Sequence, residues 1–95
     1  MNKPIPDRAW KLLERPGAWT QDAHARNESG RLVFPRAKDA VRWSAVGAIL
    51  AVYSDRKWEV LRELTGLFQN GLGIWNNDPE RTQEEVVQFL KELDI

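Results

Sequence analysis

The longest apolar run of the chain, residues 45–53, constrains the fold more than any other feature. It lies within a longer segment, residues 39–53, whose apolar side chains cover most sides at helical spacing. A helix that is apolar on most sides has to be surrounded by other elements, so we expect residues 39–53 to form a central helix. The run is too short to span a bilayer, which needs about 20 residues, and we therefore expect no membrane segment.

Three further helices are expected around this central helix. Residues 7–15, 56–69 and 82–93 each repeat apolar side chains at helical intervals. The last segment opens with a capping-box pattern, in which Thr82 and Glu85 can satisfy each other's backbone donors. Its inward-facing side chains are expected to be Val86, Phe89, Leu90 and Leu93.

Residues 19–34 differ from the helical segments because their side chains alternate and are interrupted by a turn. The turn-rich stretch is residues 27–30, and strand-like residues resume at 32–34 before Pro35. This pattern predicts a small two-stranded hairpin near 19–34 that packs on helices, since an isolated hairpin is marginal. We therefore expect a mainly α (α+β) fold and, at 95 residues, a single domain over 1–95 with one core.

Composition excludes several kinds of site. The chain has no cysteine and one histidine, His24, so it cannot hold a thiolate zinc site or a multi-histidine site within one chain. We expect no metal and no cofactor. Residues 1–6 are polar and proline-rich, without the apolar core of a signal peptide, which predicts a cytoplasmic protein.

Charge is balanced overall but unevenly placed. Residues 78–95 hold two basic and six acidic side chains, while residues 1–77 hold twelve basic and eight acidic ones. Such a distribution permits head-to-tail contacts between copies, or a basic body with an acidic final helix; a mixed solvated surface is the simplest interpretation.

Polar and aromatic side chains concentrate between residues 75 and 82. The first backbone N–H groups of the last helix can bind an anion there, and Arg81 can add a bidentate donor. Local roles explain the same residues, because amide and carboxylate side chains favour turns and Thr82 caps the helix. The candidate binding residues of this segment are Trp75, Asn76, Asn77, Asp78, Arg81 and Thr82.

Two further candidates come from the tryptophans and the histidine. Trp19 and Trp75 flank turns, so they are better placed than the other tryptophans to anchor a partner, although packing in the core is the favoured interpretation even for these two. Trp10, Trp43 and Trp58 fall in helical stripes and are expected in or near the core. His24 can be drawn into a nucleophilic triad with Ser44 and either Asp22 or Asp78, but no nucleophile-elbow glycines surround Ser44, so we expect no catalytic residue.

A basic bias marks the middle of the chain. Between Arg26 and Arg42 there are five basic side chains and two acidic ones, which can approach a phosphate backbone. The zero net charge, and the lack of helix-turn-helix or zinc-finger spacing, disfavour nucleic acid as the partner.

Three blocks of sequence resemble a family of small bacterial and bacteriophage proteins catalogued as a domain of unknown function. They are residues 17–21 (GAWTQ), 43–49 (WSAVGAI) and 75–86, where WNND leads to RT and EV. This chain has Ser44 where the family usually has cysteine, and Asn77 marks either an insertion or a shift in the last block. The resemblance implies a bacterial or phage protein and brings no activity.

These observations favour a non-catalytic protein-interaction or regulatory module over an enzyme. We expect it to bind an unknown protein partner, or itself, through the surface near four residues: Trp19, Trp75, Asn76 and Arg81. One alternative is a small ligand-binding domain or enzyme that uses the turn from Trp75 to Thr82. A second is nucleic-acid binding through the region from Arg26 to Arg42.

Overall fold

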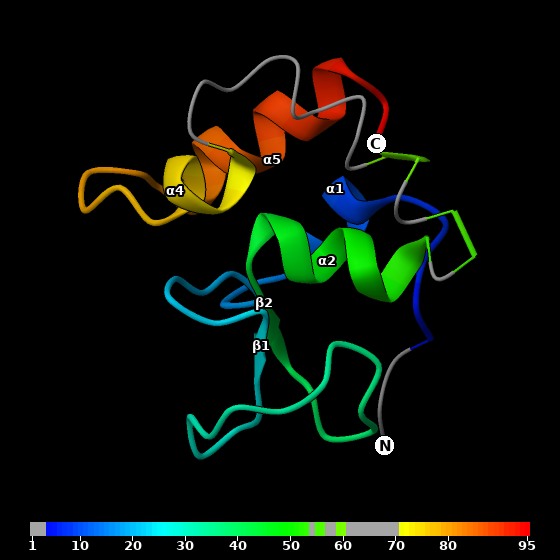
Figure 1. Cartoon of the computed structure of the whole chain (residues 1–95), viewed down its shortest axis with the longest axis vertical. Helices are drawn as coiled ribbons and strands as arrows, with labels where there is room; N and C mark the ends of the chain where they lie inside the picture. Colours follow the sequence, from blue (N-terminus) through cyan, green and yellow to red (C-terminus); the bar gives the residue numbers. More distant parts are fainter. Residues whose placement is uncertain (1–3, 54, 57–58, 61–70) are drawn as a thin grey trace.

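A computed structural model of the chain describes residues 4–53, 55–56, 59–60 and 71–95 (Figure 1). Short helices and one small antiparallel sheet make an α+β fold, which confirms the expected class. None of the described helices has the length and apolar character that a membrane crossing requires. The elements of the described residues are α1 (Ala9–Leu13), β1 (Ala25–Arg26), β2 (Arg42–Trp43), α2 (Ala45–Val52), α4 (Leu72–Asn76) and α5 (Gln83–Glu92).

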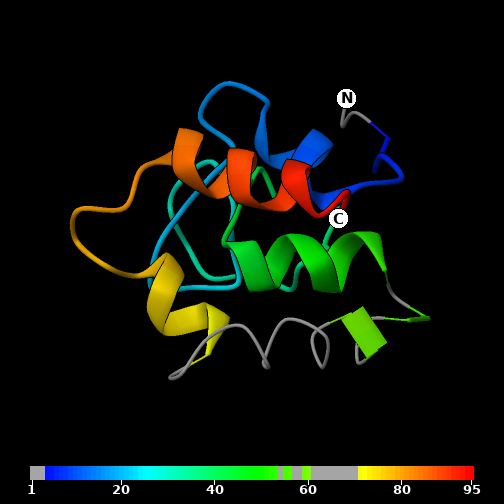
Figure 2. The same cartoon turned by 90° about the horizontal axis from the view of Figure 1, so that it is seen from above.

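Helix α2 lies at the centre of the fold, as its sequence predicts. Its Ala45, Ala48 and Ile49 are fully buried, and α1 packs against both α2 and α5 (Figures 1 and 2). The core is completed by buried side chains of those neighbours, among them Leu12 on α1 and Leu90 on α5.

The prediction of a helix over residues 39–53 is wrong at its N-terminal end, because α2 begins only at Ala45. Ser44 has an extended backbone, and its hydroxyl accepts the N–H of Gly47 at 3.0 Å, so it caps α2 and the helix starts at Ala45. Just before it, the backbone N–H of Trp43 bonds to the carbonyl of Ala18 at 2.7 Å, which holds this part of the chain extended. Trp43 is buried, as expected, but on strand β2 instead of a helix.

The sheet joins two segments that are farther apart in sequence than the expected hairpin. Strand β1 lies within residues 19–34, but its antiparallel partner is β2, with Ala25 opposite Trp43. The turn after β1 returns the chain for one isolated bridge, between Arg26 and Leu32. The buried indole of Trp43 anchors β2 to the core, whereas Leu32 remains exposed, so the longer-range pairing is the one that gains burial.

The remaining helices follow the predictions only in part. Helix α1 is shorter than the expected 7–15, and most of the expected helix over 56–69 lies outside the described residues. Helix α4 was not predicted at all. Helix α5 has its capping box, but Leu93 is 41% exposed instead of inward-facing, because the helix ends at Glu92 and the chain then turns back through Asp94 at a φ of 54°.

The two ends of the described chain are tied together. The carbonyl oxygen of Ile95 accepts from the N–H groups of Ala9 (2.6 Å) and Trp10 (3.3 Å) and from the hydroxyl of Tyr53 (3.1 Å). It therefore satisfies the first donors of α1, which lack partners within their own helix. Beside it, Arg8 pairs with Asp94, and the hydrogen bond from this guanidinium lowers the pKa of the Asp94 carboxyl.

Candidate functional site

Asn76, the last residue of α4, is fully buried. Its Oδ1 accepts from Trp19 Nε1 at 2.7 Å and from the N–H of Ala45 at 3.0 Å. Its Nδ2 donates to the carbonyl of Thr20 at 3.2 Å and to Asn77 Oδ1 at 3.0 Å. All four bonds that a carboxamide ordinarily makes are thus formed within the chain, and Asn76 joins α4 to the first turn of α2 and to residues 19–20.

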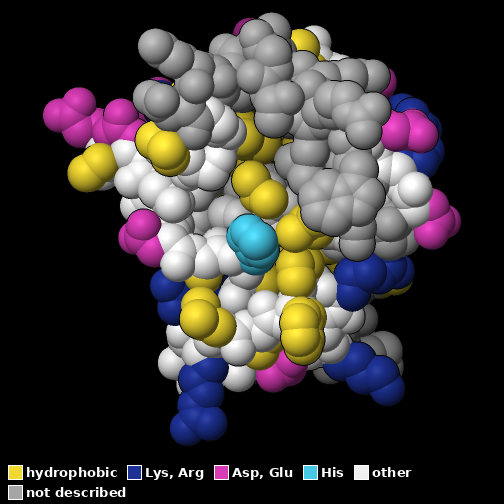
Figure 3. All heavy atoms as spheres, in the orientation of Figure 1, with side chains coloured by type: hydrophobic (Ala, Val, Ile, Leu, Met, Phe, Trp, Pro, Cys, Tyr) yellow, Lys and Arg dark blue, Asp and Glu magenta, His cyan; other side chains and the backbone are white. Residues whose placement is uncertain are grey.

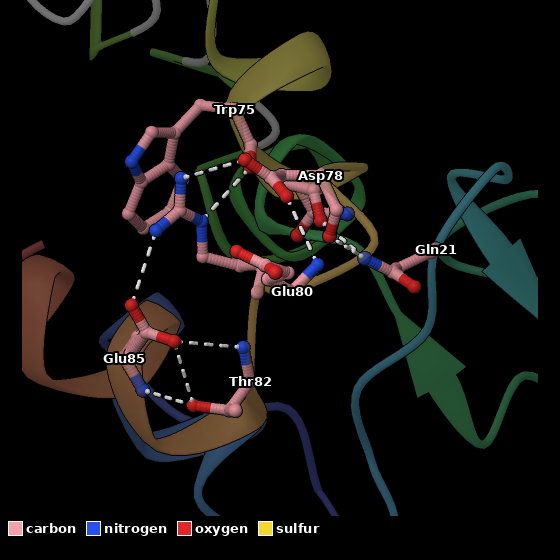
Figure 4. A network of polar contacts seen from close by, with 8 residues as sticks. Gln21, Trp75, Asp78, Glu80, Thr82 and Glu85 are labelled. Carbon is pink, nitrogen blue, oxygen red and sulfur yellow. Dashed lines mark hydrogen bonds and ion pairs between the residues drawn. The ribbon is translucent and has the colours of Figure 1, made fainter.

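The neighbours of Asn76 strengthen the same connection. Gln21 Nε2 donates to the carbonyl oxygens of Asn76 and Asp78, and Figure 4 shows this amide pointing toward Asp78. Asn77 Oδ1 also accepts the N–H of Asp22 at 2.9 Å. We call this set the polar corner: Trp19, Gln21, Asn76, Asn77 and Asp78. Its side chains and backbone mainly hold residues 19–22 against residues 76–78.

Arg81 extends the polar corner toward α5. Its guanidinium carbon lies 4.2 Å from the ring centroid of Trp75, its Nε donates to the Trp75 carbonyl at 3.0 Å, and one terminal nitrogen lies 3.1 Å from the carboxylate of Glu85 (Figure 4). A second ion pair, at 3.8 Å, reaches Asp78. The sequence predicted that the Arg81 guanidinium could bind an anion. In the structure it is bound instead by carboxylates, a carbonyl and an indole of the same chain.

The beginning of α5 is likewise occupied. Thr82 Oγ1 accepts the N–H of Glu85 at 3.2 Å, and Glu85 Oε1 accepts the N–H of Thr82 at 3.2 Å, which is the capping box that the sequence predicts. Glu84 and Glu85 also place two carboxylates in the first turn. This geometry stabilises the helix and works against an added anion, because the positive end of the helix dipole already faces negative charge.

A hollow of about 540 Å³ opens beside the polar corner, around His24. Its walls are formed by residues 22–25, which lead into β1, and by residues 32–33. The start of α2 and helix α4 with Asn77 complete them. Figure 3 shows hydrophobic side chains (yellow) gathered around the histidine (cyan) on this side of the molecule. The lining includes His24, Leu32, Val33, Val46, Gly73 and Asn77.

The sequence suggested a triad of His24, Ser44 and either Asp22 or Asp78. Of these four residues, all except Asp78 line the hollow. Ser44 is buried, and its oxygen accepts the N–H of Gly47, as a helix cap does. Across the described residues, no hydrogen bond joins the side chains of these three residues, and no three histidine or carboxylate groups gather as metal ligands. The geometry shows a capped helix beside an exposed histidine and no assembled triad.

Large apolar side chains remain exposed in the wall of this hollow or directly after its wall residues in the sequence. Leu32, in its wall, is 69% exposed; Phe34, two residues further on, is 84% exposed; and Ile74, next to the wall residue Gly73, is 63% exposed. We call His24, Leu32, Phe34, Val46 and Ile74 together the apolar face. Of these five residues, only His24 was predicted from the sequence as a candidate binding residue. The overlooked signal was the run of three consecutive apolar residues at 32–34 beside a turn, which a sheet with one buried face does not need.

The arginines of the basic region mostly bind carbonyl groups of the chain itself. Arg26 donates to the carbonyl of Gly30 and to Thr20 Oγ1, Arg36 to the carbonyl of Ala51, and Arg42 to the carbonyl of Asn27. The other two cations of this region, Arg31 and Lys38, are exposed, and their side chains bind no other group among the described residues. The region thus presents at its surface two cations that have no partner in the part of the chain that the structure describes.

One comparison with known proteins gives a match. A family model described as "Family of unknown function (DUF6197)" matches residues 5–93, which is nearly the whole chain. No curated protein and no solved structure matches the chain.

Proposed function

Since the chain belongs to DUF6197, a family of unknown function, we propose a function from its own geometry: it is a non-catalytic interaction module that binds a partner protein through the apolar face. In keeping with the sequence blocks described above, the proposed setting is the cytoplasm of a bacterium or of a phage-infected cell. The proposal moves the binding surface away from Trp19 and Asn76, whose polar groups are engaged inside the chain.

The observation that carries this proposal is the exposure of Leu32, in the wall of the hollow, and of Phe34 and Ile74, each next in sequence to a wall residue. Removing apolar surface from water contributes roughly 25 cal/mol per Å², so three large side chains left in water can supply much of the affinity for a partner. Exposed apolar surface with a concave centre is typical of protein-binding sites, in which a few large side chains carry most of the binding energy.

The exposed imidazole of His24 adds a polar group to the middle of this surface. Interfaces commonly combine an apolar centre with a few hydrogen-bonding groups that fix the orientation of the partner. His24 has both a donor and an acceptor nitrogen in its neutral form, so it can bond to a backbone N–H or C=O of a partner segment.

The test is affinity capture from a lysate of cells that naturally contain the protein. The bait variant Leu32→Ser/Phe34→Ser/Ile74→Ser removes the exposed apolar side chains and keeps the polar corner. The matched control is Leu93→Ser, which also removes an exposed leucine but lies beyond the end of α5. Circular dichroism should show that all three proteins are equally folded.

We expect one partner protein to be retained by the wild type and by Leu93→Ser, and lost at least tenfold with the triple variant. Equal retention by the triple variant would contradict the proposed surface. Recovery of nucleic acid with steep salt dependence would favour the region from Arg26 to Arg42 instead, and turnover or saturable binding of a small molecule that Arg81→Gln abolishes would favour the turn from Trp75 to Thr82.

A further inference from the structure

Charge is separated along the longest axis of the molecule. Helix α5 lies at one end of this axis in Figure 1, and the loop between β1 and β2, residues 27–41, extends to the other end. Residues 78–95, which include α5, carry six acidic and two basic side chains. Residues 26–42 carry five basic and two acidic ones. These two segments of opposite charge lie toward opposite ends of the 36 Å axis, and we call them the acidic end and the basic end.

The acidic end contains an aromatic hollow of about 470 Å³. Its rings are Trp75 and Phe89, whose centroids lie 5.0 Å apart. Glu84, on its wall, forms no ion pair or hydrogen bond through its side chain among the described residues, and Glu92 accepts only from the amide of Gln88. We call this set the acidic hollow: Trp75, Glu84, Glu85, Gln88, Phe89 and Glu92.

A contact within the chain indicates that the acidic hollow binds cations. Arg81 already lies over the Trp75 ring and pairs with Glu85 at the edge of the acidic hollow. Aromatic rings attract cations through their negatively charged faces, and carboxylates add direct charge attraction. The other carboxylates of the hollow, Glu84 and Glu92, leave room for one or two further cationic side chains.

The basic end provides such cations. Arg31 and Lys38 are exposed and unpartnered among the described residues, whereas the nearby carboxylate of Asp39 lies 3.3 Å from the side-chain amide of Asn27. Neither cation forms an ion pair with a described residue of its own copy, so we take both as available to another molecule.

From this complementarity we infer that the acidic hollow binds the Arg31 and Lys38 end of a second copy of the same chain. Because the two surfaces differ, the contact is head-to-tail, and an open assembly keeps one unused surface at each of its two ends. Association can therefore continue beyond a dimer. It is held largely by exposed charges, so it is weak, and it is strongest at low ionic strength, where screening is least.

Sedimentation velocity across protein concentrations, at 20 mM and 300 mM NaCl, tests this inference. The acidic-end variant is Glu84→Gln/Glu92→Gln, and the basic-end variant is Arg31→Gln/Lys38→Gln. Both change only exposed side chains, so both should fold. The matched control is Glu28→Gln, which removes an exposed carboxylate at the basic end, where head-to-tail contact does not need one.

We expect the wild type and Glu28→Gln to form dimers and larger species at low salt, with association at least tenfold weaker at high salt. Each double variant alone should be monomeric. A one-to-one mixture of the two should form dimers that grow no further, because each variant contributes its one intact end. A monomeric wild type at low salt, salt-insensitive association, or a mixture that stays monomeric would each overturn the inference.

The outcome is separable from that of the proposed function. Ile74→Ser changes the apolar face and leaves the acidic hollow and both basic side chains in place, so it should keep wild-type self-association. Loss of self-association in Ile74→Ser, with retention in both double variants, would assign the self-contact to the apolar face and overturn the head-to-tail arrangement.

Discussion

Asn77 belongs to the polar corner and also lines the hollow beside the apolar face, yet these two regions are built in opposite ways. In the polar corner, hydrogen-bonding groups concentrate at a turn and are bonded to one another, with the Asn76 side chain fully buried. In the apolar face, large side chains stand in water beside a hollow. The difference teaches that a conspicuous polar cluster can be interior structure, while the surface available for binding is the one whose groups the fold leaves uncovered.

The largest effect should come from Asn76→Ala, which breaks the polar corner at its centre. It leaves the Trp19 indole N–H and the N–H of Ala45 without their acceptor in a buried place. Since each unsatisfied buried group costs about 1–3 kcal/mol, we expect the free energy of unfolding to fall by about 3 kcal/mol or more. Urea unfolding followed by tryptophan fluorescence measures this change.

The matched variant for that comparison is Leu32→Ser in the apolar face. Because Leu32 is mostly exposed, its replacement should change the free energy of unfolding by less than about 0.5 kcal/mol. Similar losses of stability in Asn76→Ala and Leu32→Ser would remove the distinction between an interior corner and a free surface.

Gly47→Ala should have the next largest effect, because it strains the wall of the hollow from within. A Cβ at position 47 would overlap the backbone carbonyl of His24, so the segment that carries His24 has to move. We expect a loss of about 2 kcal/mol in the free energy of unfolding, together with weaker partner binding.

Gly73→Ala is the control for that substitution. Gly73 also lines the hollow, but a Cβ there meets open space, and its φ is not in the left-handed region. Alanine on helix α4 should therefore keep or slightly raise stability. Equal damage from the two alanines would mean that the close approach of α2 to His24 does not shape this face.

Thr82→Ala should have a smaller effect, confined to the edge of the polar corner. It removes the hydroxyl that accepts the N–H of Glu85, so the capping box of α5 is lost. Such caps contribute about 1 kcal/mol, which corresponds to a fall of roughly 4–8 °C in the melting temperature of a domain of this size. Thr82→Ser should restore most of the loss in thermal unfolding, and an unchanged melting temperature for Thr82→Ala would contradict the role of the cap.

The smallest effect should come from the exposed pair of Arg8 and Asp94, which lies in neither region. The hydrogen bond from Arg8 holds the pKa of Asp94 below its usual range, so the pair stabilises the fold above the unfolded-state pKa of this carboxyl. That contribution disappears as the pH falls through the lowered pKa.

Asp94→Asn should therefore be slightly less stable than the wild type at pH 7, and the two should converge once the pH has fallen below the lowered pKa of Asp94. Asparagine tolerates the positive φ of this position, so the backbone need not change. Denaturant unfolding between pH 2 and pH 7 measures the difference, and parallel curves over that whole range would contradict the assignment.

The sequence predicted the elements that depend on local pattern. The capping box at Thr82 and Glu85 and the central position of α2 follow from neighbouring residues, and both are present. Strand β2 and helix α4 escaped prediction, because β2 is held by bonds to Ala18 and to residues 24–26, and α4 is only five residues long. Long-range bonds of this kind leave no periodic trace in the chain.

The candidate site was harder to predict for a related physical reason. Residue type reports what a side chain can bond, but it does not report whether the fold already uses that capacity. Asn76, with all its bonds filled, and Leu32, with its side chain in water, show both directions of this failure. Of the candidate binding residues, His24 and Asn77 line the hollow, and their role in binding stays a prediction.

The most direct measurement is photo-crosslinking from the apolar face in living cells. A photoreactive phenylalanine analogue at Phe34 should give one dominant adduct with another protein, identified by mass spectrometry, while the same analogue at Leu93 or Trp19 should give none. Adducts from Trp19 with no adduct from Phe34 would contradict the account, because they would place the partner at the polar corner instead of the apolar face.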